Sequence, residues 1–351
     1  MNTFGTTLRL TTFGESHGAS IGGVIDGFPP RIKVDFDLIE RRMAERRPGQ
    51  PGTTQRKEDD RPEFLSGISP AGITLGTPIG FIIRNKDTRS ADYTQLATAF
   101  RPNHADYAYQ AKYGIRDHRG GGRASARETA CRVVAGALAE QFLLEKAISI
   151  EARLVEAGSV KCDAISSTES GDFEGRALPA VPDVLMAEIE KARMEKDSIG
   201  GVVECVINGV PAGLGNPLYD KLSARLAYAM MSINAAKGFE IGDGFALART
   251  RGSEVIDEFY TDGLKGIKTH TNHNGGILGG ISSGMPINFR VGFKPTPTIG
   301  RPLPLLTEEG EVKTVAVPGR HDPCVAVRAV PVVRAMAALV IADFLLQDSK
   351  V

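Results

Sequence analysis

Two stretches far apart in the chain share one pattern of glycines, apolar residues and a closing turn. Residues 20–30 read SIGGVIDGFPP, and residues 198–213 read SIGGVVECVINGVPAG. In both, a strand-like run ends in Gly-x-Pro and is followed by helix-start signals, near Asp37 and Asp220. The stretch at 275–293, GGILGGISSGMPINFRVGF, repeats the strand part once more. Short glycine-rich motifs also match by chance, but we favour an internal duplication, which restricts the fold to paired copies of one unit.

The order of the expected strands and helices favours an α+β fold over a doubly wound parallel sheet. Glycines flank three strand-like runs, at 21–25, 202–207 and 287–291. Helical spacing indicates an exposed, charged helix at 182–196, a buried helix at 222–231 and a long apolar helix at 329–347. Long parallel strand-helix-strand repeats are few. Because the 40 glycines are spread along the chain and mark no linker, we expect one domain spanning residues 1–351.

The charge balance and the terminal sequence exclude several functional classes. Lysine plus arginine and aspartate plus glutamate both number 42, and the chain has no tryptophan, which argues against a nucleic-acid partner. The sequence begins without a secretory signal, and no run of about 18 apolar residues predicts a membrane span. We therefore expect a cytoplasmic protein without a membrane partner. Neither GxGxxG after a strand nor GxxxxGK[ST] occurs, so no Rossmann or P-loop nucleotide site is predicted.

Cysteines and histidines do not form a metal-binding pattern. His270 and His273 have HxxH spacing but no carboxylate close by in the sequence, so no metal site is predicted. The four cysteines are far apart, lack CxxC spacing and are interpreted as buried thiols: Cys131, Cys162, Cys205 and Cys324.

A run of glycines between arginines, followed by a helical pattern, predicts an anion site at residues 117–138, DHRGGGRASARETACRVVAGAL. Ser125 and Glu128 fit a capping box, which places a helix start near Ala126. Consecutive glycines let the main chain approach a ligand, and a helix N-terminus offers free N–H groups and partial positive charge. The flanking arginines, such as Arg123, add full charges. A mobile glycine loop before a core helix is the alternative interpretation.

Four further polar clusters lie in turns or glycine-rich segments. In ERRMAERRPGQPGTTQR, Arg42 and Arg46 are four residues apart and would share a helix face suited to one phosphate or carboxylate. A solvated basic face is the alternative. The other clusters, TTFGESHG, RPNHADY and PGRHDPC, contain His17, His104 and His321. Arginines together with histidines that act as acids or bases suit a polyanionic substrate with phosphate as leaving group.

Taken together, these motifs resemble the chorismate synthase family. The longest likenesses are GESHGASIGGVIDGFPP, RGGGRASARETACRVVAGAL and RHDPCVAVRAVP. HADY, MSINAAKGFEIGDGF, NHNGGILGGISSG and KPT fit the same family pattern, and the likeness extends from about Phe4 to Phe344. The resemblance implies conversion of 5-enolpyruvylshikimate 3-phosphate to chorismate, a 1,4-anti elimination of phosphate and a ring proton.

The resemblance also implies a cofactor, an architecture and an assembly. The reaction needs reduced FMN although it has no net redox change, the flavin lending an electron and accepting the proton at N5. The implied fold is a βαβ sandwich with an internal pseudo-two-fold repeat, assembled as a homotetramer. The chain length leaves no room for an added reductase domain, so we expect an external flavin reductase to supply reduced FMN. Reduction of the flavin by this chain with NADPH stays open.

Carried over by motif position, the resemblance assigns roles to individual residues. His17 and His104 would donate protons, to the flavin and to the leaving phosphate, and Asp322 would help the flavin N5 act as a base. Ser16 and Ser125 would orient these groups. Substrate carboxylates and phosphate would be held by arginines: Arg46, Arg47, Arg101 and Arg132. FMN would contact Arg123, Ala124, Ser125, Asn234, Ala235, Gly279, Lys294, Pro295, Thr296, Pro297, Thr298 and Arg320.

Two positions depart from the family pattern. After Arg47 the chain reads PGQPGTTQ, where many members have one more residue and a further arginine, so that arginine's contact to phosphate or to a reductant nucleotide is in doubt. Arg334 replaces the usual glutamate, and we interpret it as structural or interface variation. The alternative to an enzyme is a flavin- or phosphate-binding paralogue without elimination activity. Retention of His17, His104 and Asp322 favours the enzyme.

Overall fold

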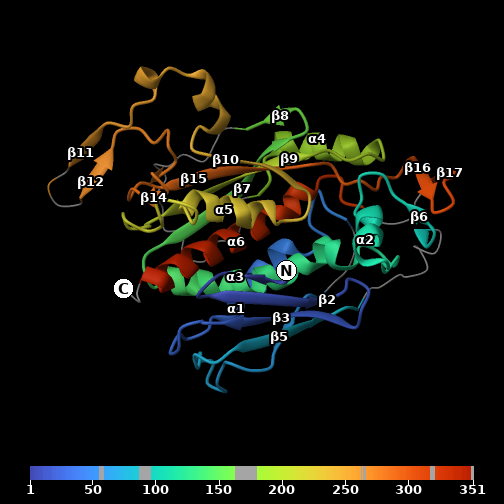
Figure 1. Ribbon diagram of the computed structural model, residues 1–351, viewed down its shortest axis with the longest axis horizontal. Helices are drawn as coiled ribbons and strands as arrows, with labels where there is room; N and C mark the ends of the chain where they lie inside the picture. Colours follow the sequence, from blue (N-terminus) through green and yellow to red (C-terminus); the bar gives the residue numbers. More distant parts are fainter. Residues whose placement is uncertain are drawn as a thin grey trace.

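Two antiparallel sheets form the outer layers of the protein, and long helices fill the space between them (Figure 1). The computed structural model describes residues 1–54, 59–86, 96–162, 180–261, 263, 266–316 and 321–348. In spatial order the first sheet contains β1 (Thr3–Phe4), β2 (Arg9–Gly14), β3 (Ser20–Asp26), β5 (Ile79–Arg84) and β4 (Pro62–Phe64). The second contains β10 (Ala236–Ile241), β15 (Ile287–Phe293), β9 (Gly201–Asn208), β7 (Ser149–Ala157) and β8 (Val160–Lys161). The helices between them are α1 (Phe36–Arg46), α3 (Thr129–Leu144), α5 (Leu222–Met231) and α6 (Val325–Asp348).

Shorter elements surround this sandwich. A small sheet near α2 (Asp106–Tyr113) contains β17 (Val312–Ala316), β16 (Pro302–Thr307) and β6 (Ala99–Phe100). α4 (Asp183–Met194) packs against β7 and β8 on the outer side of the second sheet. Two antiparallel pairs are β11 (Phe259–Thr261) with β12 (Ile267–Thr269), and β13 (Ile277–Leu278) with β14 (Ile281–Ser282). Short 3-10 turns lie at Gly122–Ala124, Ala126–Glu128, Gly244–Arg249 and Gly252–Glu254.

The expected α+β sandwich is confirmed, with two differences in its helices. β3, β9 and β15 are the expected strands, and α4, α5 and α6 are the expected helices. α6 starts at Val325 and not at residue 329, because Pro331 is accommodated inside the helix. α5 is buried on one face only: Leu226 is buried, whereas Tyr228 is 48% exposed. An amphipathic helix at the side of the layer thus replaces the expected fully buried one.

The expected internal repeat is present in the order of the elements. The first half of the chain runs through an antiparallel strand pair, helix α1, two more strands and helix α3. The second half runs through an equivalent pair, helix α5, two more strands and helix α6. As a result, the sheet order β1-β2-β3-β5-β4 matches β8-β7-β9-β15-β10.

Equivalent hydrogen bonds fix one turn in each half. The Thr74 hydroxyl donates to the carbonyl of Pro29 at 2.7 Å, and the Ser282 hydroxyl donates to the carbonyl of Pro211 at 2.6 Å. The surrounding sequences are GITLGTPIGF in the first half and GISSGMPINF in the second. The stretch at 275–293 is therefore the counterpart of this segment, and its interpretation as a further copy of the central strand is wrong.

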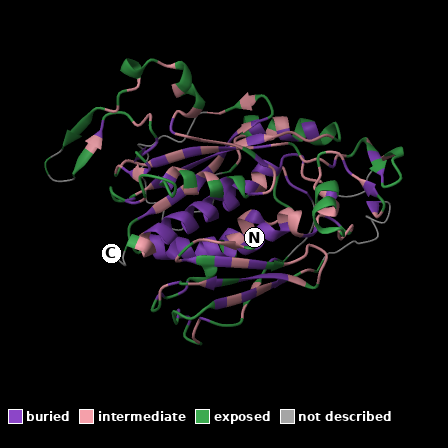
Figure 2. Cartoon of the chain, viewed as in Figure 1, coloured by how far each residue is buried: buried purple, intermediate pink, exposed green. Residues whose placement is uncertain are grey.

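Helices α3 and α6 pack in close contact at the centre of the core. A Cβ atom at Gly136 of α3 would lie 2.3 Å from Cβ of Ala335 in α6, so only glycine permits this approach. Figure 2 shows burial concentrated in this helical layer. Contrary to the sequence expectation, α6 is long and apolar enough to cross a membrane by length and composition, but 89% of that stretch is buried inside the protein. It is the central core helix of the sandwich.

We expect Gly136→Ala to destabilise the protein by about 1–3 kcal/mol, because the added methyl group overpacks the contact between α3 and α6. The better helix propensity of alanine, worth up to about 1 kcal/mol, opposes this loss. Urea unfolding monitored by circular dichroism measures the difference. Gly252→Ala is the control, since its Cβ would meet nothing within 4 Å. A Gly136→Ala protein as stable as the control would contradict the close contact.

Candidate active site

Predicted residues from distant parts of the chain line one cavity of about 430 Å³. Its wall is formed by the turn between β2 and β3, the loop after α1, the residues after β5, the turn between β6 and α2, the glycine-rich loop before α3, the turn after α5, the segment after β15 and the start of α6. The predicted residues on this wall are Ser16, His17, Arg101, His104, Ala124, Ser125, Asn234, Ala235, Lys294, Thr296, Pro297, Thr298 and Asp322. Most of the predicted site thus converges in space.

Two helices begin at this cavity. The 3-10 turn that leads into α3 contributes Ser125 to the wall, and the first turn of α6 contributes Val325. Because unpaired N–H groups give a helix N-terminus a partial positive charge, both ends favour an anion. Arg127 and Arg328 add full charges on the same wall. The cavity is therefore suited to a negatively charged ligand.

The three consecutive glycines pass between two side chains of the turn after β2. Gly120 has φ +81°, and a Cβ atom there would lie 2.8 Å from the imidazole of His17. Gly122 has φ +51°, and its Cβ would lie 3.0 Å from the carboxylate of Glu15. Both the left-handed backbone and the lack of space require glycine here. The loop is consequently packed in place against His17.

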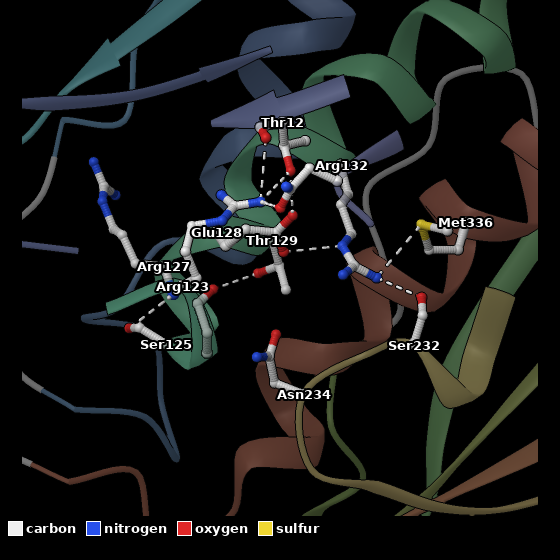
Figure 3. A network of polar contacts seen from close by, with 12 residues as sticks. Thr12, Arg123, Ser125, Arg127, Glu128, Thr129, Arg132, Ser232, Asn234 and Met336 are labelled. Atoms are coloured by element: carbon white, nitrogen blue, oxygen red, sulfur yellow. Dashed lines mark hydrogen bonds and ion pairs between the residues drawn. The ribbon is translucent and has the colours of Figure 1, made fainter. Parts of the chain in front are cut away.

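The predicted capping box forms only in part (Figure 3). The Ser125 hydroxyl accepts from the backbone N–H of Arg127 at 3.2 Å and caps a single 3-10 turn ahead of α3. The Glu128 carboxylate instead accepts from the Thr12 hydroxyl at 2.9 Å and from Arg132 at 3.0 Å. The prediction that Glu128 caps the backbone is wrong, because its buried carboxylate pairs with Arg132, one helical turn further along the chain.

A buried carboxylate holds His104 in one orientation. Nδ1 of His104 lies 2.7 Å from Oδ1 of Asp106, and Arg101 donates two hydrogen bonds of 2.8 Å to the same carboxylate. Burial raises the pKa of Asp106, but hydrogen bonds from Arg101 and His104 outweigh burial and keep the pKa well below its usual range. The ionised carboxylate accepts a hydrogen bond from Nδ1–H, which leaves Nε2 of His104 for a ligand. Arg101 also donates to the carbonyl of Gly120 at 2.9 Å.

Asp322 is fixed by a separate donor on each carboxylate oxygen. The backbone N–H of Thr54 donates to Oδ1 at 2.9 Å, and Arg328 donates to Oδ2 at 2.9 Å. The backbone carbonyl of Asp322 accepts from the Thr296 hydroxyl at 2.9 Å. These bonds connect the start of α6 with the loop after α1 and with the segment predicted to hold FMN.

Two buried arginines next to the cavity share one carboxylate. Nη1 of Arg46 lies 2.9 Å from Oδ2 of Asp60, and Arg127 binds the other oxygen. The side chains of Arg46 and Asp60 are 1% and 0% exposed. Burial raises the pKa of Asp60, but both guanidinium groups lower it below the usual range. Arg46 also donates to the carbonyl of Ala126 at 2.7 Å, so it supports the turn before α3.

The hypothesis that Arg42 and Arg46 share a bound anion is wrong. Arg42 donates to both oxygens of Glu140, at 2.9 and 2.8 Å, whereas Arg46 is paired with Asp60. Arg334, the departure on α6, donates to Glu140 at 2.6 Å. This buried ion group joins α1, α3 and α6, which agrees with the structural interpretation of Arg334.

Several predicted residues lie away from the cavity wall. Arg123 donates to the Thr12 hydroxyl at 2.8 Å and lines a neighbouring cavity of about 770 Å³ that shares the glycine loop (Figure 3). Arg132 donates to the Ser232 hydroxyl at 2.7 Å. The wall also lacks Arg46, Arg47, Pro295 and Gly279, and Arg320 lies outside the described residues.

The cysteines and the two histidines of the HxxH pair lie outside the cavity wall. His273 has a carboxylate partner that its sequence neighbours did not indicate, since its Nδ1 lies 2.6 Å from Asp243. Within the described part of the chain, no group of three His, Cys, Asp or Glu side chains is placed to hold a metal ion. The cysteines are all free thiols, buried at Cys131, Cys205 and Cys324 and half-buried at Cys162.

The structure adds cavity residues that the sequence analysis did not single out. Asp106 follows His104 with the His-x-Asp spacing of HADY, a signal for an oriented imidazole. Arg127 and Arg328 lie in the first turns at the two helix starts. The sequence signal that could have identified them is an arginine directly after a helix-start motif. Thr54 has no local signal, because it reaches the cavity only through tertiary packing.

Gly120→Ala is expected to destabilise the protein more than Gly114→Ala. Both glycines have left-handed φ, +81° and +72°, so each alanine costs about 1–2 kcal/mol of backbone strain. Only at Gly120 would the new Cβ meet His17, whereas nothing lies within 4 Å at Gly114. We expect a further loss of about 1–3 kcal/mol at Gly120, measured by urea unfolding. Equal losses in both variants would show that the loop is not packed on His17.

Acid should destabilise the protein through Asp60 and Asp106. Their folded pKa values lie below the unfolded value of about 3.9, so their contribution is fully present above that pH and is lost as pH falls through the folded pKa. Asp60→Asn is expected to lose about 3–5 kcal/mol at pH 7, because two buried guanidinium groups lose their counter-ion.

Asp59→Asn is the matched control, since Asp59 is exposed and pairs at the surface with Lys86, a contact that adds little to stability. Urea unfolding between pH 3 and 7 measures both variants. A neutral-pH stability of Asp60→Asn equal to that of Asp59→Asn would rule out the buried counter-ion.

Comparisons with known proteins agree with this geometry. A family model described as chorismate synthase matches residues 8–346. A chorismate synthase of Porphyromonas gingivalis is 54% identical over 350 residues, which cover 98% of this chain and 95% of that protein. One of Crocosphaera subtropica is 52% identical over 357 residues, covering 99% and 97%. A crystal structure of chorismate synthase matches with a TM-score of 0.75 and 32% identity, over 98% of this chain and 93% of that one.

The match extends over both halves of the sandwich and over every segment that lines the cavity. The resemblance seen in the motifs is therefore confirmed by full-length similarity in sequence and in fold. We conclude that the chain belongs to the chorismate synthase family, a family of carbon–oxygen lyases.

Proposed function

We propose that this chain converts 5-enolpyruvylshikimate 3-phosphate to chorismate and phosphate by 1,4-anti elimination, using reduced FMN without net redox change. The observation that carries the proposal is the convergence of His17, His104 and Asp322 on one cavity wall between two helix N-termini. The substrate carries carboxylates and a phosphate, which the positive helix ends and the guanidinium groups of the wall stabilise.

The wall suits a flavin because it carries polar atoms that need a partner. The Ser16 hydroxyl and Oδ1 of Asn234 are buried and have no hydrogen-bond partner among the described residues. A ligand that bonds to such atoms offsets the cost of burying them. When bound, reduced FMN would lend an electron to the substrate, accept the ring proton at N5 and recover the electron, so that the elimination has no net redox change. The residues proposed to hold it are Arg123, Ala124, Ser125, Asn234, Ala235, Gly279, Lys294, Pro295, Thr296, Pro297, Thr298 and Arg320.

The chain's own groups then handle protons and charge. Asp106 accepts a hydrogen bond from Nδ1–H of His104, and in the doubly protonated imidazolium form the Nε2–H donates its proton to the leaving phosphate. His17, packed on Gly120, donates to the flavin. Two donors hold the Asp322 carboxylate in place, and its proposed role is to help the flavin N5 act as a base. The Ser125 hydroxyl caps its turn and its backbone N–H donates to the carbonyl of Gly122 at 3.3 Å, so a contact of Ser125 with the cofactor would share a group that is already hydrogen-bonded.

The arginines divide into ligand-binding and supporting groups. Nε and Nη2 of Arg47 are buried without a partner among the described residues, but Arg47 lies outside the cavity wall, so its proposed role in holding substrate rests on the family resemblance. Arg101 faces the cavity while it holds Asp106. Arg46 and Arg132, predicted as substrate ligands, are paired with carboxylates and act through the position and charge of α3.

The proposal also includes the assembly and the supply of reduced flavin. We expect a cytoplasmic homotetramer that receives reduced FMN from an external flavin reductase, with NADPH as the reductant of the pathway. The arm containing β11 and β12 extends away from the sandwich (Figure 1), and its apolar Phe259 and Ile267 are 64% and 66% exposed. An exposed apolar arm supports contact with a second copy of the chain.

Under anaerobic conditions with photoreduced FMN, the purified protein is expected to release phosphate from 5-enolpyruvylshikimate 3-phosphate. His104→Ala is expected to slow this release by about 10²- to 10⁴-fold, the scale of a lost general acid. His270→Ala is the control, because that exposed histidine stacks on Tyr260 in the arm and lies outside the cavity.

Two results would count against this function. Flavin binding without phosphate release by the unaltered protein would favour the paralogue that lacks elimination activity. An unchanged rate in His104→Ala would remove that residue from the mechanism.

A further inference from the structure

Two neighbouring threonines in the loop after α1 have opposite hydrogen bonding. Thr53 and Thr54 are both buried, at 8% and 6% exposure. The Thr53 hydroxyl donates to the carbonyl of Gln50 at 2.7 Å and accepts from the N–H of Gly49 at 3.1 Å. The Thr54 hydroxyl has no hydrogen-bond partner among the described residues. A buried hydroxyl without a partner is unfavourable, so Thr54 needs another reason for its position.

Thr54 stands at the cavity wall beside Asp322. Its backbone N–H donates to Oδ1 of Asp322 at 2.9 Å, while Arg328 occupies Oδ2. Both oxygens of the Asp322 carboxylate therefore already accept hydrogen bonds, one from the Thr54 backbone and one from Arg328. The Thr54 hydroxyl makes no bond to this carboxylate. Arg328 offsets the charge of Asp322, whereas Arg46 and Arg127 share the single charge of Asp60, so these groups and the start of α6 together leave the surroundings net positive. An anionic oxygen is thus the partner that this position favours.

We infer that Thr54 is a substrate-binding residue whose hydroxyl donates a hydrogen bond to an anionic oxygen of the bound substrate beside Asp322. This inference rests on the proposed function, because it takes the substrate to be the phosphate and carboxylate compound named there. The hydroxyl and methyl groups of threonine are similar in size, so a change of rotamer turns the hydroxyl toward the ligand without repacking the loop.

Three variants separate this role from a structural one. Thr54→Val removes the hydroxyl and keeps the backbone bond to Asp322, so we expect unchanged or higher thermal stability and about 10- to 100-fold weaker substrate binding. Thr54→Ser keeps the hydroxyl and should bind within about 3-fold of the unaltered protein. Thr53→Val is the matched control, because it removes two satisfied hydrogen bonds of the loop and should lower thermal stability with binding within about 3-fold.

Isothermal titration with 5-enolpyruvylshikimate 3-phosphate, in the presence of oxidised FMN, measures the affinity, and thermal shift with inorganic phosphate tests the phosphate alone. Weaker binding of both ligands by Thr54→Val supports a contact to the phosphate, and weaker binding of the substrate alone supports a contact to a carboxylate. Full affinity in Thr54→Val, or an equal loss in Thr53→Val, overturns the inference.

The same data keep this inference apart from the proposed function. If the unaltered protein binds substrate and the two valine variants differ as expected but no phosphate is released, the elimination fails and the role of Thr54 stands. If turnover is normal and Thr54→Val binds like the unaltered protein, only the role of Thr54 falls. If the unaltered protein binds no substrate, both are overturned.

Discussion

The close contact of α3 with α6 sets the geometry on which the site depends. Gly136 leaves no room for a side chain against Ala335, so the two helices of the internal repeat lie at backbone contact. Both helices begin at the same cavity, and their N-termini bring partial positive charge to it from the two halves of the chain. A wider separation of these helices would move Asp322 away from the glycine-rich loop. The duplicated fold thus creates one site where its copies meet.

Buried carboxylates determine which arginines are left for a ligand. Asp60 holds Arg46 and Arg127, Asp106 holds Arg101, and Glu140 holds its own pair on α1 and α6. Asp60 and Glu140 each fix two guanidinium groups that would repel one another if unpaired, and Asp106 fixes one. Positive charge near the cavity is therefore ordered before any ligand arrives, so binding requires little rearrangement of charged side chains. This preorganisation suits a reaction in which charge develops on a departing phosphate.

The sequence predicted the elements and the motifs of the site well, because both depend on local patterns. Glycines, β-type runs and helical spacing located the strands and most helices, and the histidine motifs met in one cavity as expected. The partners of charged side chains were not predictable, because tertiary packing chooses them. Glu128 pairs with Arg132 and not with the backbone of Ser125, and Arg46 meets Asp60 through a loop of no regular pattern. Local spacing contains no information on such pairs.

The central claim is that substrate and flavin occupy the cavity between the starts of α3 and α6. The crystal structure of the protein with oxidised FMN and 5-enolpyruvylshikimate 3-phosphate tests this claim most directly. We predict electron density for both molecules among His17, His104 and Asp322, with the phosphate within hydrogen-bond distance of His104 Nε2. Ordered density for both ligands elsewhere on the protein, with this cavity holding only water, would contradict the account.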